Sequence, residues 1–520
     1  MRHRLRLLDT HPRVSILLVV ADEDEIWIAA SATSVFNQVY DHVDLCVCDN
    51  ASSRPHVAAV LRGLASDGRV QTCSLPERDS QARAWNEALE LSRGEYVAVL
   101  DPGDEIAPET LFRAVELLAT DGDLVYTDED EIDVAGRPSN PTFKPSWSPD
   151  LLLSTNYVGR LSVARRSLVE DLGGFRHGFE GAAEHDLTLR LAERTDRIRH
   201  LPWICYHRRR FPQAIPKDDT AARSDVLRQA VKRRGIEGAI EPGLAPKTLR
   251  VVRDVPGDLR TSVISMATEP SSEYRSKLED MAGYPIHEVL EAGRPREDRD
   301  TTVPSRFPAR TLNLAAQEAE GEYLVFLGVG TTPVTHGWLS EMLRQAHRRG
   351  AGAVGGRLLE GSSHRPRAGG AVTLALLGGE EHAPGVADGA RYQPALDYPC
   401  NFPVAGEWIA VRRAVFEDAG GFDEENLPTA FFGLDLSLRL EEAGLLNVYT
   451  PHAGAIWDPA RPAAPSPQEI AHMWGRWWSA LVEMLYYASS PVRGGYDREA
   501  LETVLAASLS RAAPTDLQTS

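Results

Sequence analysis

The chain of 520 residues has few cysteines and no long run of apolar side chains. Its five cysteines are odd in number and lack the spacing of a metal finger, which favours a reducing compartment over a disulfide framework. The apolar run that begins at Val14 is short and acids follow it in "ADEDE", so it is typical of neither a signal peptide nor a membrane span. We therefore expect a cytoplasmic protein.

Positive charge is also scarce. The chain has 56 lysines and arginines against 75 aspartates and glutamates, which gives a formal net charge of −19. This excess of acid argues against a nucleic-acid partner, whose phosphates are bound mainly by lysine and arginine. A polyanionic ligand would need a metal ion or a few local arginines. The 42% of hydrophobic and 25% of charged residues are ordinary for a globular protein of roughly two to four domains.

Three apolar runs predict buried strands, at residues 14–20, 42–50 and 95–100. Helix-length segments separate them. The pattern therefore indicates an α/β fold with a mostly parallel sheet, whose ligands bind at the carboxyl ends of the strands. The third run stops at "DPGDE", residues 101–105. This Pro-Gly pair between acids could be a surface turn, or it could hold a divalent metal at the end of the strand.

The chain contains an internal repeat. The segment from Ala82 to Leu111 aligns without gaps with a segment that begins at Ala309. Two further matches follow in the same order, "VARRSLVEDLGGF" with "VRRAVFEDAGGF" and "DLTLRL" from Asp186 with "DLSLRL" from Asp435. Three ordered matches predict two domains of one fold.

The repeat also predicts where the domains begin and end. A junction at "VVRDVPGDLR" divides a first domain, residues 13–250, from a second domain, residues 251–460. A linker rich in proline and alanine leads into a C-terminal helical segment and tail, residues 461–520. Aromatic and aliphatic residues of this segment recur at helical spacing, which indicates docking contacts rather than a cofactor site.

Residues kept in both copies are expected to serve the fold. The kept positions are Arg83 and Arg310, Asn86 and Asn313, and the Gly-Gly-Phe triplets at 173–175 and 420–422. Asp186 recurs as Asp435 just before an apolar helical pattern, where we expect the side chain to cap the helix.

Polar residues lost from the second copy are expected to serve function. "LDPGDE" becomes "LGVGTT" in the second copy, so the turn is kept while its carboxylates are lost. Three further polar residues of the first copy are lost in the second: Asp49 aligns with Gly293, Glu184 aligns with Gly433, and His207 falls against "AIWDP", where no histidine is present. Their joint loss is what a single site predicts.

Residues 13 to about 215 resemble a family 2 glycosyltransferase of the nucleotide-sugar-binding GT-A fold. The resemblance is carried, in this order, by "VSILLVV", "GEYVAVLDPGDEIAP", "LVYTDEDEID", "FKPSWSPDLLLSTNYVGRL", "GGFRHGFEGAAEHDLTLRLAERT" and "RHLPWICYHRRR". Residues 262 to about 458 resemble the same family. The resemblance implies an α/β fold with two tandem, Rossmann-like GT-A domains and a C-terminal helical extension. Tandem domains of this type occur among bacterial enzymes that build cell-surface polysaccharides, including O-antigen.

The resemblance implies a divalent cation, Mg²⁺ or Mn²⁺, that stabilises the charge building on the leaving diphosphate. Asp104 resembles the direct metal ligand of the family, and Asp101 would support the site through the sugar or the ribose. His207 resembles a histidine that completes the metal shell, although a histidine at a strand end can also be a packing or surface residue. Gly103 stands where the family often has a third aspartate.

The resemblance gives roles to four further residues. Glu184 occupies the position of the catalytic base, normally an aspartate; alternatively it is a first-turn acid favoured by the helix dipole. Asp49 resembles the acid that binds the nucleotide base or ribose; alternatively it closes an Asx turn. Arg208 would face phosphate, and Trp147 would line the sugar or acceptor pocket unless it is a packed loop aromatic.

Together these roles imply an inverting, metal-dependent glycosyltransferase. It would move a sugar from a nucleotide-diphosphate donor to a lipid-linked glycan acceptor in the synthesis of a cell-surface polysaccharide. The protein would be in peripheral contact with the inner face of the membrane. The second domain, which has lost the metal and base positions, would be degenerate. The alternative is a non-catalytic glycan-binding or scaffold protein. It is favoured by the first strand, which continues as Val19 to Asp22 where the family usually has Pro-Thr-Tyr-Asn.

Overall fold

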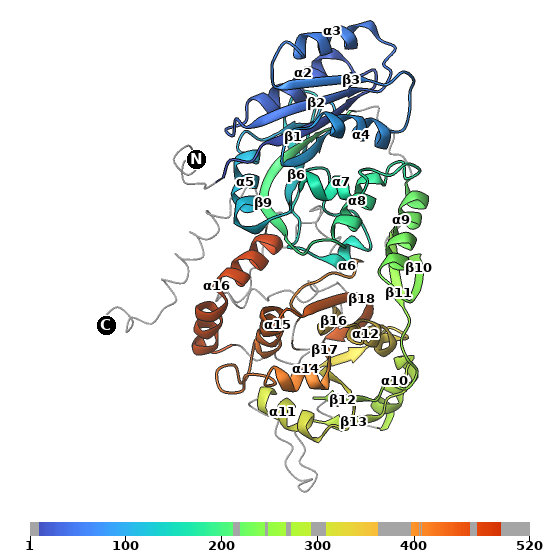
Figure 1. Cartoon of the computed structure of the whole chain (residues 1–520). Helices are drawn as coiled ribbons and strands as arrows, with labels where there is room; N and C mark the ends of the chain where they lie inside the picture. The colour runs from blue at the N-terminus through green and yellow to red at the C-terminus, as the bar shows by residue number, and fades with distance from the viewer. Residues whose placement is uncertain are drawn as a thin grey trace, which may run out of the picture. The chain divides into compact units, whose positions relative to one another are not determined.

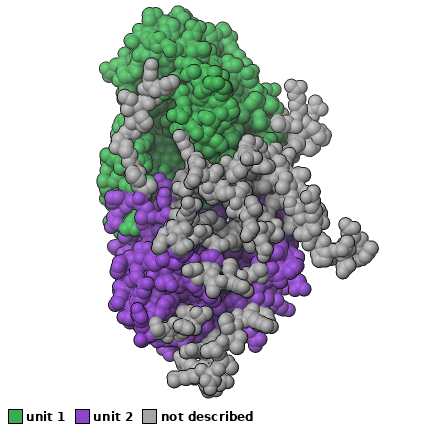
Figure 2. Space-filling view, turned by 180° about the vertical axis from the view of Figure 1, so that it is seen from behind, with its two compact units in different colours: residues 1–240, 247–251 green, residues 241–246, 252–520 purple. Residues whose placement is uncertain are grey.

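The computed structural model describes residues 10–211, 219–244, 248–266, 272–292, 308–361, 397–404, 406, 408–457 and 465–489. The chain divides into two compact units, residues 1–240 with 247–251 and residues 241–246 with 252–520 (Figures 1 and 2). Gly293, the predicted linker up to residue 464 and the tail from residue 490 lie outside the described residues. No helix in the described ranges combines the length and the apolar character needed to cross a membrane.

The first unit is centred on a nine-stranded mixed sheet (Figure 1). Its strands are β1 (Val14–Val20), β2 (Val43–Asp49), β3 (Val70–Ser74), β4 (Tyr96–Leu100), β5 (Glu105–Ile106), β6 (Leu124–Ile132), β7 (Pro138–Thr142), β8 (Ser162–Arg165) and β9 (Ile198–Arg209). Its helices are α2 (Glu25–Phe36), α3 (Pro55–Leu64), α4 (Gln81–Leu91), α5 (Thr110–Asp121), α6 (Pro149–Leu152), α7 (Arg166–Asp171), α8 (Ala183–Leu191) and α9 (Thr220–Arg233). A small separate sheet pairs β10 (Gly238–Pro242) with β11 (Leu249–Arg253).

The strand order is β3-β2-β1-β4-β8-β6-β9-β5, with β7 paired to β6. The pairs among β1, β2, β3 and β4 are parallel, as the alternating sequence pattern predicted. Every residue of β1 and β4 is buried because core covers both faces of the sheet. Leu17 and Val19 belong to one hydrophobic cluster, whereas Ile16 and Leu18 belong to another, as the alternation of side chains along a strand requires.

The second unit is built in the same way. Its strands are β12 (Thr261–Ser265), β13 (Glu288–Glu291), β14 (Tyr323–Leu327), β15 (Thr331–Pro333), β16 (Ala351–Glu360), β17 (Trp408–Arg412) and β18 (Leu446–Trp457). Its helices are α10 (Ser272–Ala282), α11 (Pro308–Glu318), α12 (Trp338–Ala346), α14 (Arg413–Asp418), α15 (Phe432–Glu442) and α16 (Pro467–Ser489). The strand order β13-β12-β14-β17-β16-β18-β15 repeats β2-β1-β4-β8-β6-β9-β5, and each pair keeps its parallel or antiparallel direction. The predicted fold class of two tandem α/β domains is therefore confirmed.

Residues shared by the copies make the same structural contacts in both units. Asn86 donates from Nδ2 to the carbonyl of Phe175 and accepts from its N–H, both at 2.8 Å. Asn313 makes the same two bonds to Phe422, both at 2.9 Å. A side chain that satisfies one backbone donor and one acceptor at once fixes the loop it contacts, so this pair serves the fold in each unit.

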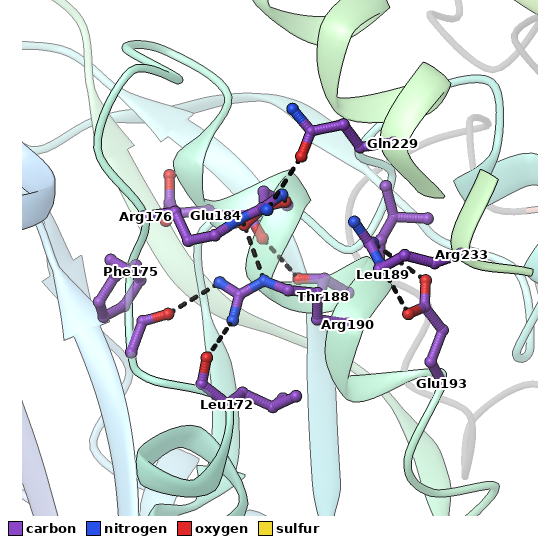
Figure 3. Close-up of polar contacts among 12 residues, drawn as sticks. Leu172, Phe175, Arg176, Glu184, Thr188, Leu189, Arg190, Glu193, Gln229 and Arg233 are labelled. Atoms are coloured by element: carbon purple, nitrogen blue, oxygen red, sulfur yellow. Dashed lines mark hydrogen bonds and ion pairs between the residues drawn. The ribbon is translucent and has the colours of Figure 1, made fainter. Parts of the chain in front are cut away.

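Asp186 corrects one sequence-based prediction, because it lies inside α8 and does not cap it. Its fully buried carboxylate pairs with Arg190 one turn later, with Nε 2.8 Å from Oδ2, and with Arg176. Arg190 in turn donates to the carbonyl of Leu172 at 2.9 Å (Figure 3). It also donates to the carbonyl of Gly174, at 2.8 Å. The first turn of the helix thus points its acid at a buried guanidinium rather than at free backbone N–H groups.

The C-terminal helix α16 packs on the second unit. Its residues Met473, Trp474 and Leu481 share a hydrophobic cluster with Leu434 and Leu438 of α15. The indole Nε1 of Trp477 also donates to Asp435 at 2.9 Å. Trp474 and Trp477 of the C-terminal segment are therefore docking contacts, as predicted.

Candidate active site

The "DPGDE" loop follows β4 and forms a turn. The N–H of Asp104 donates to the carbonyl of Asp101 at 3.1 Å, and in the second unit Thr331 donates to Gly328 at the same distance. The turn is thus common to both copies. In the first unit Ser31 of α2 also ties the loop down, because its hydroxyl donates to the carbonyl of Asp104 at 2.8 Å.

Asp104 is buried at the base of this loop, with 4% of its surface exposed. Its Oδ2 accepts from the hydroxyl of Tyr206 at 2.5 Å, and its Oδ1 accepts from the N–H of Arg209 at 2.8 Å. Burial, followed by the negative charge of Asp101, raises the pKa of Asp104 to about 7. The carboxylate of Asp104 therefore ties the loop to β9.

Arg160 brings two of the predicted site residues together. Its Nη1 lies 2.5 Å from Oε2 of Glu184 and 3.2 Å from Oδ2 of Asp101. Arg160 precedes β8, Glu184 lies in the first turn of α8, and Asp101 follows β4. Their side chains are 37%, 19% and 21% exposed, so the cluster is open to solvent on one side. Three segments far apart in sequence therefore meet at one guanidinium.

Burial and the neighbouring charges set the pKa of Glu184. Burial raises the pKa of Glu184 above its ordinary value; Arg160 opposes this rise, whereas Asp101 and Glu129 add to it. The first-turn position alone would lower the pKa, because the helix dipole favours an anion there. Perturbed acids at an open cluster are typical of functional sites.

A buried ion pair supports the segment that carries Arg160. Nζ of Lys144 lies 2.8 Å from Oε2 of Glu129 and donates to the carbonyl of Val158 at 2.7 Å. Between Val158 and Arg160, Gly159 has a φ of +76°, and a Cβ there would lie 2.4 Å from Oε2 of Glu129. Glycine is therefore required for this close approach.

The other predicted ligand-binding residues make their contacts elsewhere. Asp49 accepts from the N–H of Ser52, three residues on, at 2.9 Å, so its carboxylate closes the turn after β2, with one residue more than an Asx turn has. Arg208 is half-exposed and donates to Glu131 at 2.5 Å. Trp147 is half-buried, with its ring centroid 6.3 Å from that of Tyr157.

Comparison with known proteins identifies the family. The family model for Glycosyl transferase family 2 matches residues 15–173, a range that spans β1 to α7 of the first unit and contains the acid loop. The first unit is a family 2 glycosyltransferase domain.

Two long relatives share most of this chain. The O-antigen biosynthesis protein RfbC of Myxococcus xanthus is 33% identical over 484 residues, which are 85% of this chain and 37% of that protein. The uncharacterized protein y4gI of Sinorhizobium fredii is 29% identical over 483 residues, 86% of this chain and 53% of that protein. The solved structure of S. aureus TarS 1–349 in complex with UDP aligns with 42% of this chain and 65% of that one, at 19% identity and a TM-score of 0.35. The chain thus spans about half of the length of y4gI and less than half of that of RfbC.

The acids of the glycosyltransferase domain fit a metal that is held jointly with substrate. Within the described ranges, no group of three or more histidine, cysteine, aspartate or glutamate side chains could hold a metal by itself. Mg²⁺, however, is commonly bound by one or two carboxylates together with substrate phosphates and water. Asp104, whose pKa is raised by burial and by the charge of Asp101, offers carboxylate oxygens of the kind that such a cation prefers.

His207 lies apart from these acids. Its Nδ1 is 2.7 Å from Oδ1 of Asp130; because a carboxylate only accepts, Nδ1 carries the hydrogen. Tyr206 precedes it in β9 and reaches Asp104, so the alternation of side chains directs His207 to the other face of the strand. Only Nε2 could therefore serve a metal, and the role of His207 as a ligand stays a prediction.

Sequence reasoning missed Arg160, Tyr206 and Glu129. All three could be found by aligning the two copies through their paired strands, because each residue is replaced in the second copy. Glu129 pairs with Tyr206 across β6 and β9, and the equivalent pair in the second unit is Leu358 with Ala455. The alignment through β8 and β17 likewise sets Arg160 against Glu407, a reversal of charge.

The second unit also lacks room for a base. Gly433 stands where the first unit has Glu184, and a Cβ on Gly433 would lie 2.3 Å from the Cα of Gly406. Contact between two backbone segments therefore excludes any side chain at this position of α15.

Proposed function

We propose that the first unit transfers a sugar from a nucleotide-diphosphate donor to a glycan acceptor, lipid-linked, in the synthesis of a cell-surface polysaccharide, with inversion at the anomeric carbon. The convergence of Asp101, Asp104 and Glu184 in one unit, with its loss from the other, carries the proposal. The relative named for O-antigen biosynthesis supports the class of product.

In this proposal Glu184 is the base that takes the proton of the acceptor hydroxyl. Partial burial makes its carboxylate a stronger base than an exposed glutamate, because the ionised form is less well solvated. Arg160 holds the carboxylate in place at 2.5 Å. An acceptor hydroxyl would approach Glu184 from the solvent side of the cluster.

Asp104 is the proposed ligand of a divalent cation, Mg²⁺ or Mn²⁺. When bound, such a cation stabilises the charge that develops on the leaving diphosphate. Asp101 would orient the sugar or ribose, and Asp49 would bind the nucleotide base or ribose. Arg208 and Trp147 would face the phosphate and the sugar or acceptor, respectively.

The proposal also assigns roles to the parts of the chain. Residues 13–250 would be the active domain, residues 251–460 a degenerate domain, and residues 461–520 a C-terminal helical segment and tail. The protein would work in the cytoplasm, in peripheral contact with the inner face of the membrane.

The test combines ligand-dependent stability with turnover. Unfolding temperature would be measured with UDP-, GDP-, CDP- and dTDP-linked sugars, with and without Mn²⁺, because a ligand that binds the folded state raises it. We expect a metal-dependent rise with one donor class, lost in Asp104→Asn. Glu184→Gln should keep this rise but lower kcat by about 10²–10⁴-fold.

Glu170→Gln is the matched control for Glu184→Gln, since Glu170 also pairs with an arginine, at 2.8 Å from Arg166. It should leave kcat unchanged. If no nucleotide sugar gives a metal-dependent rise and none is transferred or hydrolysed, the proposal fails and the non-catalytic alternative holds.

A further inference from the structure

We infer that Arg160 is a positioning residue of the site: its guanidinium holds Glu184 and Asp101 and supplies the positive charge that offsets both. This inference rests on the proposed function, in which Glu184 is the base. It adds a residue to the site that neither the sequence analysis nor the comparisons single out.

The first support is the distribution of charge. Four carboxylates lie in or beside the cluster: Asp101, Asp104, Glu129 and Glu184. Lys144 is engaged by Glu129 and by a backbone carbonyl, so its charge is already compensated. Among the described contacts, Arg160 is the cation that touches both Glu184 and Asp101.

The second support is the way in which Arg160 is anchored. Lys144 donates to the carbonyl of Val158, and the Cα of Gly159 faces the Glu129–Lys144 ion pair, which leaves no room for a Cβ. The Lys144 side chain is 3% exposed, so the anchor is shielded from solvent. This anchor fixes the backbone from which the Arg160 side chain reaches Glu184 and Asp101.

The third support comes from the two copies. Four arginines of the first copy recur at equivalent positions, Arg83 as Arg310, Arg165 as Arg412, Arg166 as Arg413 and Arg190 as Arg439, whereas Arg176, which pairs with Asp186, aligns with Asp423. Arg160 does not recur, and the aligned residue is Glu407. It is lost together with Asp101 and Glu184, as a residue that serves those two carboxylates should be.

Removal of Arg160 should weaken Glu184 as a base at neutral pH. The charged groups that face Glu184 are Arg160, Asp101 and Glu129, with Lys144 behind Glu129. Without the arginine, two anions and burial act on Glu184 unopposed, so its carboxyl is protonated up to a higher pH. A protonated carboxyl cannot accept the proton of the acceptor.

The kinetic test compares Arg160→Met, Arg160→Lys and the control Arg166→Met. Arg166 is matched to Arg160 in exposure, 34% against 37%, and also pairs with a glutamate. We expect kcat of Arg160→Met at pH 7 to fall by about five- to tenfold, because a one-unit rise in the pKa of a base lowers its ionised fraction by at most tenfold. The acid limb of its pH profile should move to higher pH, with KM for the donor changed less than kcat and partial rescue in Arg160→Lys.

A second measurement does not depend on turnover. Unfolding temperatures of Arg160→Met, Glu184→Gln and the double variant form a cycle at pH 8, where we expect non-additive shifts because the two residues are in contact. Additive shifts, or an unmoved pH profile in an active Arg160→Met, would overturn the inference and leave the proposed function standing. If the cycle shows coupling but the wild-type protein has no transferase activity, the contact between Arg160 and Glu184 stands and the proposed function is overturned.

Discussion

Replacement of Gly159 by alanine tests the support of the active site most directly. Gly159 and Gly136 both have a left-handed backbone, with φ of +76° and +78°, which costs an alanine about 1–2 kcal/mol. Gly136 has nothing within 4 Å of an added Cβ, whereas at Gly159 this atom would lie 2.4 Å from Oε2 of Glu129 and 2.5 Å from Nζ of Lys144. The two substitutions therefore share the backbone cost and differ only in the steric clash.

The magnitude follows from the burial of the displaced pair. The side chains of Lys144 and Glu129 are 3% and 17% exposed, so they have little space into which to retreat. Breaking a buried ion pair costs about 3–5 kcal/mol. We therefore expect Gly136→Ala to lower the free energy of unfolding by about 1–2 kcal/mol, and Gly159→Ala to lower it by on the order of 5 kcal/mol.

Urea unfolding of the wild type and both variants at pH 7 measures the difference. Transferase turnover, measured in parallel, should be normal in Gly136→Ala and reduced in Gly159→Ala, because Arg160 follows the displaced residue. If Gly159→Ala costs no more stability than Gly136→Ala, the Glu129–Lys144 pair does not anchor this segment and the reasoning is refuted.

Two further predictions concern pH and the second unit. Burial lowers the pKa of His185 to about 4, so the stability that its neutral form contributes is present above pH 6.5 and is lost as pH falls toward 4. Between pH 7 and 5, the free energy of unfolding in urea should fall by about 2 kcal/mol more in the wild type than in His185→Gln. An equal fall in both proteins would contradict this prediction. Asp435→Ala should lower the free energy of unfolding by about 3–5 kcal/mol, because it leaves Arg439 without its buried partner, while the metal-dependent rise with the donor sugar persists. Loss of that rise would place Asp435 in donor binding instead.

Short-range pattern in the sequence was enough to predict the α/β class and the tandem repeat. Apolar runs with separating helices fix strands such as β1 and β4, because burial of such a run needs no knowledge of its neighbours. Comparison of the copies also separated Asn86, which holds a loop in each unit, from the acids of the "DPGDE" loop.

Sequence pattern failed where the fold, and not the local motif, chooses the partner of a residue. Asp186 has the pattern of a helix cap, yet its partners are Arg190 and Arg176. Arg160 carries no motif of its own, and only the meeting of the loop after β4, the loop before β8 and the start of α8 gives it two carboxylates to hold. Charge, burial and hydrogen bonding depend on such meetings, because electrostatic interactions act through space rather than along the chain.

The sequence by itself determined that the acids of "DPGDE" belong to the first copy alone, since "GVGTT" keeps the turn without them. Only the tertiary structure decided what surrounds those acids. It buries Asp104 beneath Tyr206, ties Asp101 to Glu184 through Arg160, and closes the matching position of the second unit by backbone contact between Gly433 and Gly406. The pKa of a carboxyl and the space for a side chain are set by atoms that folding brings within a few ångströms, and no local pattern contains those distances.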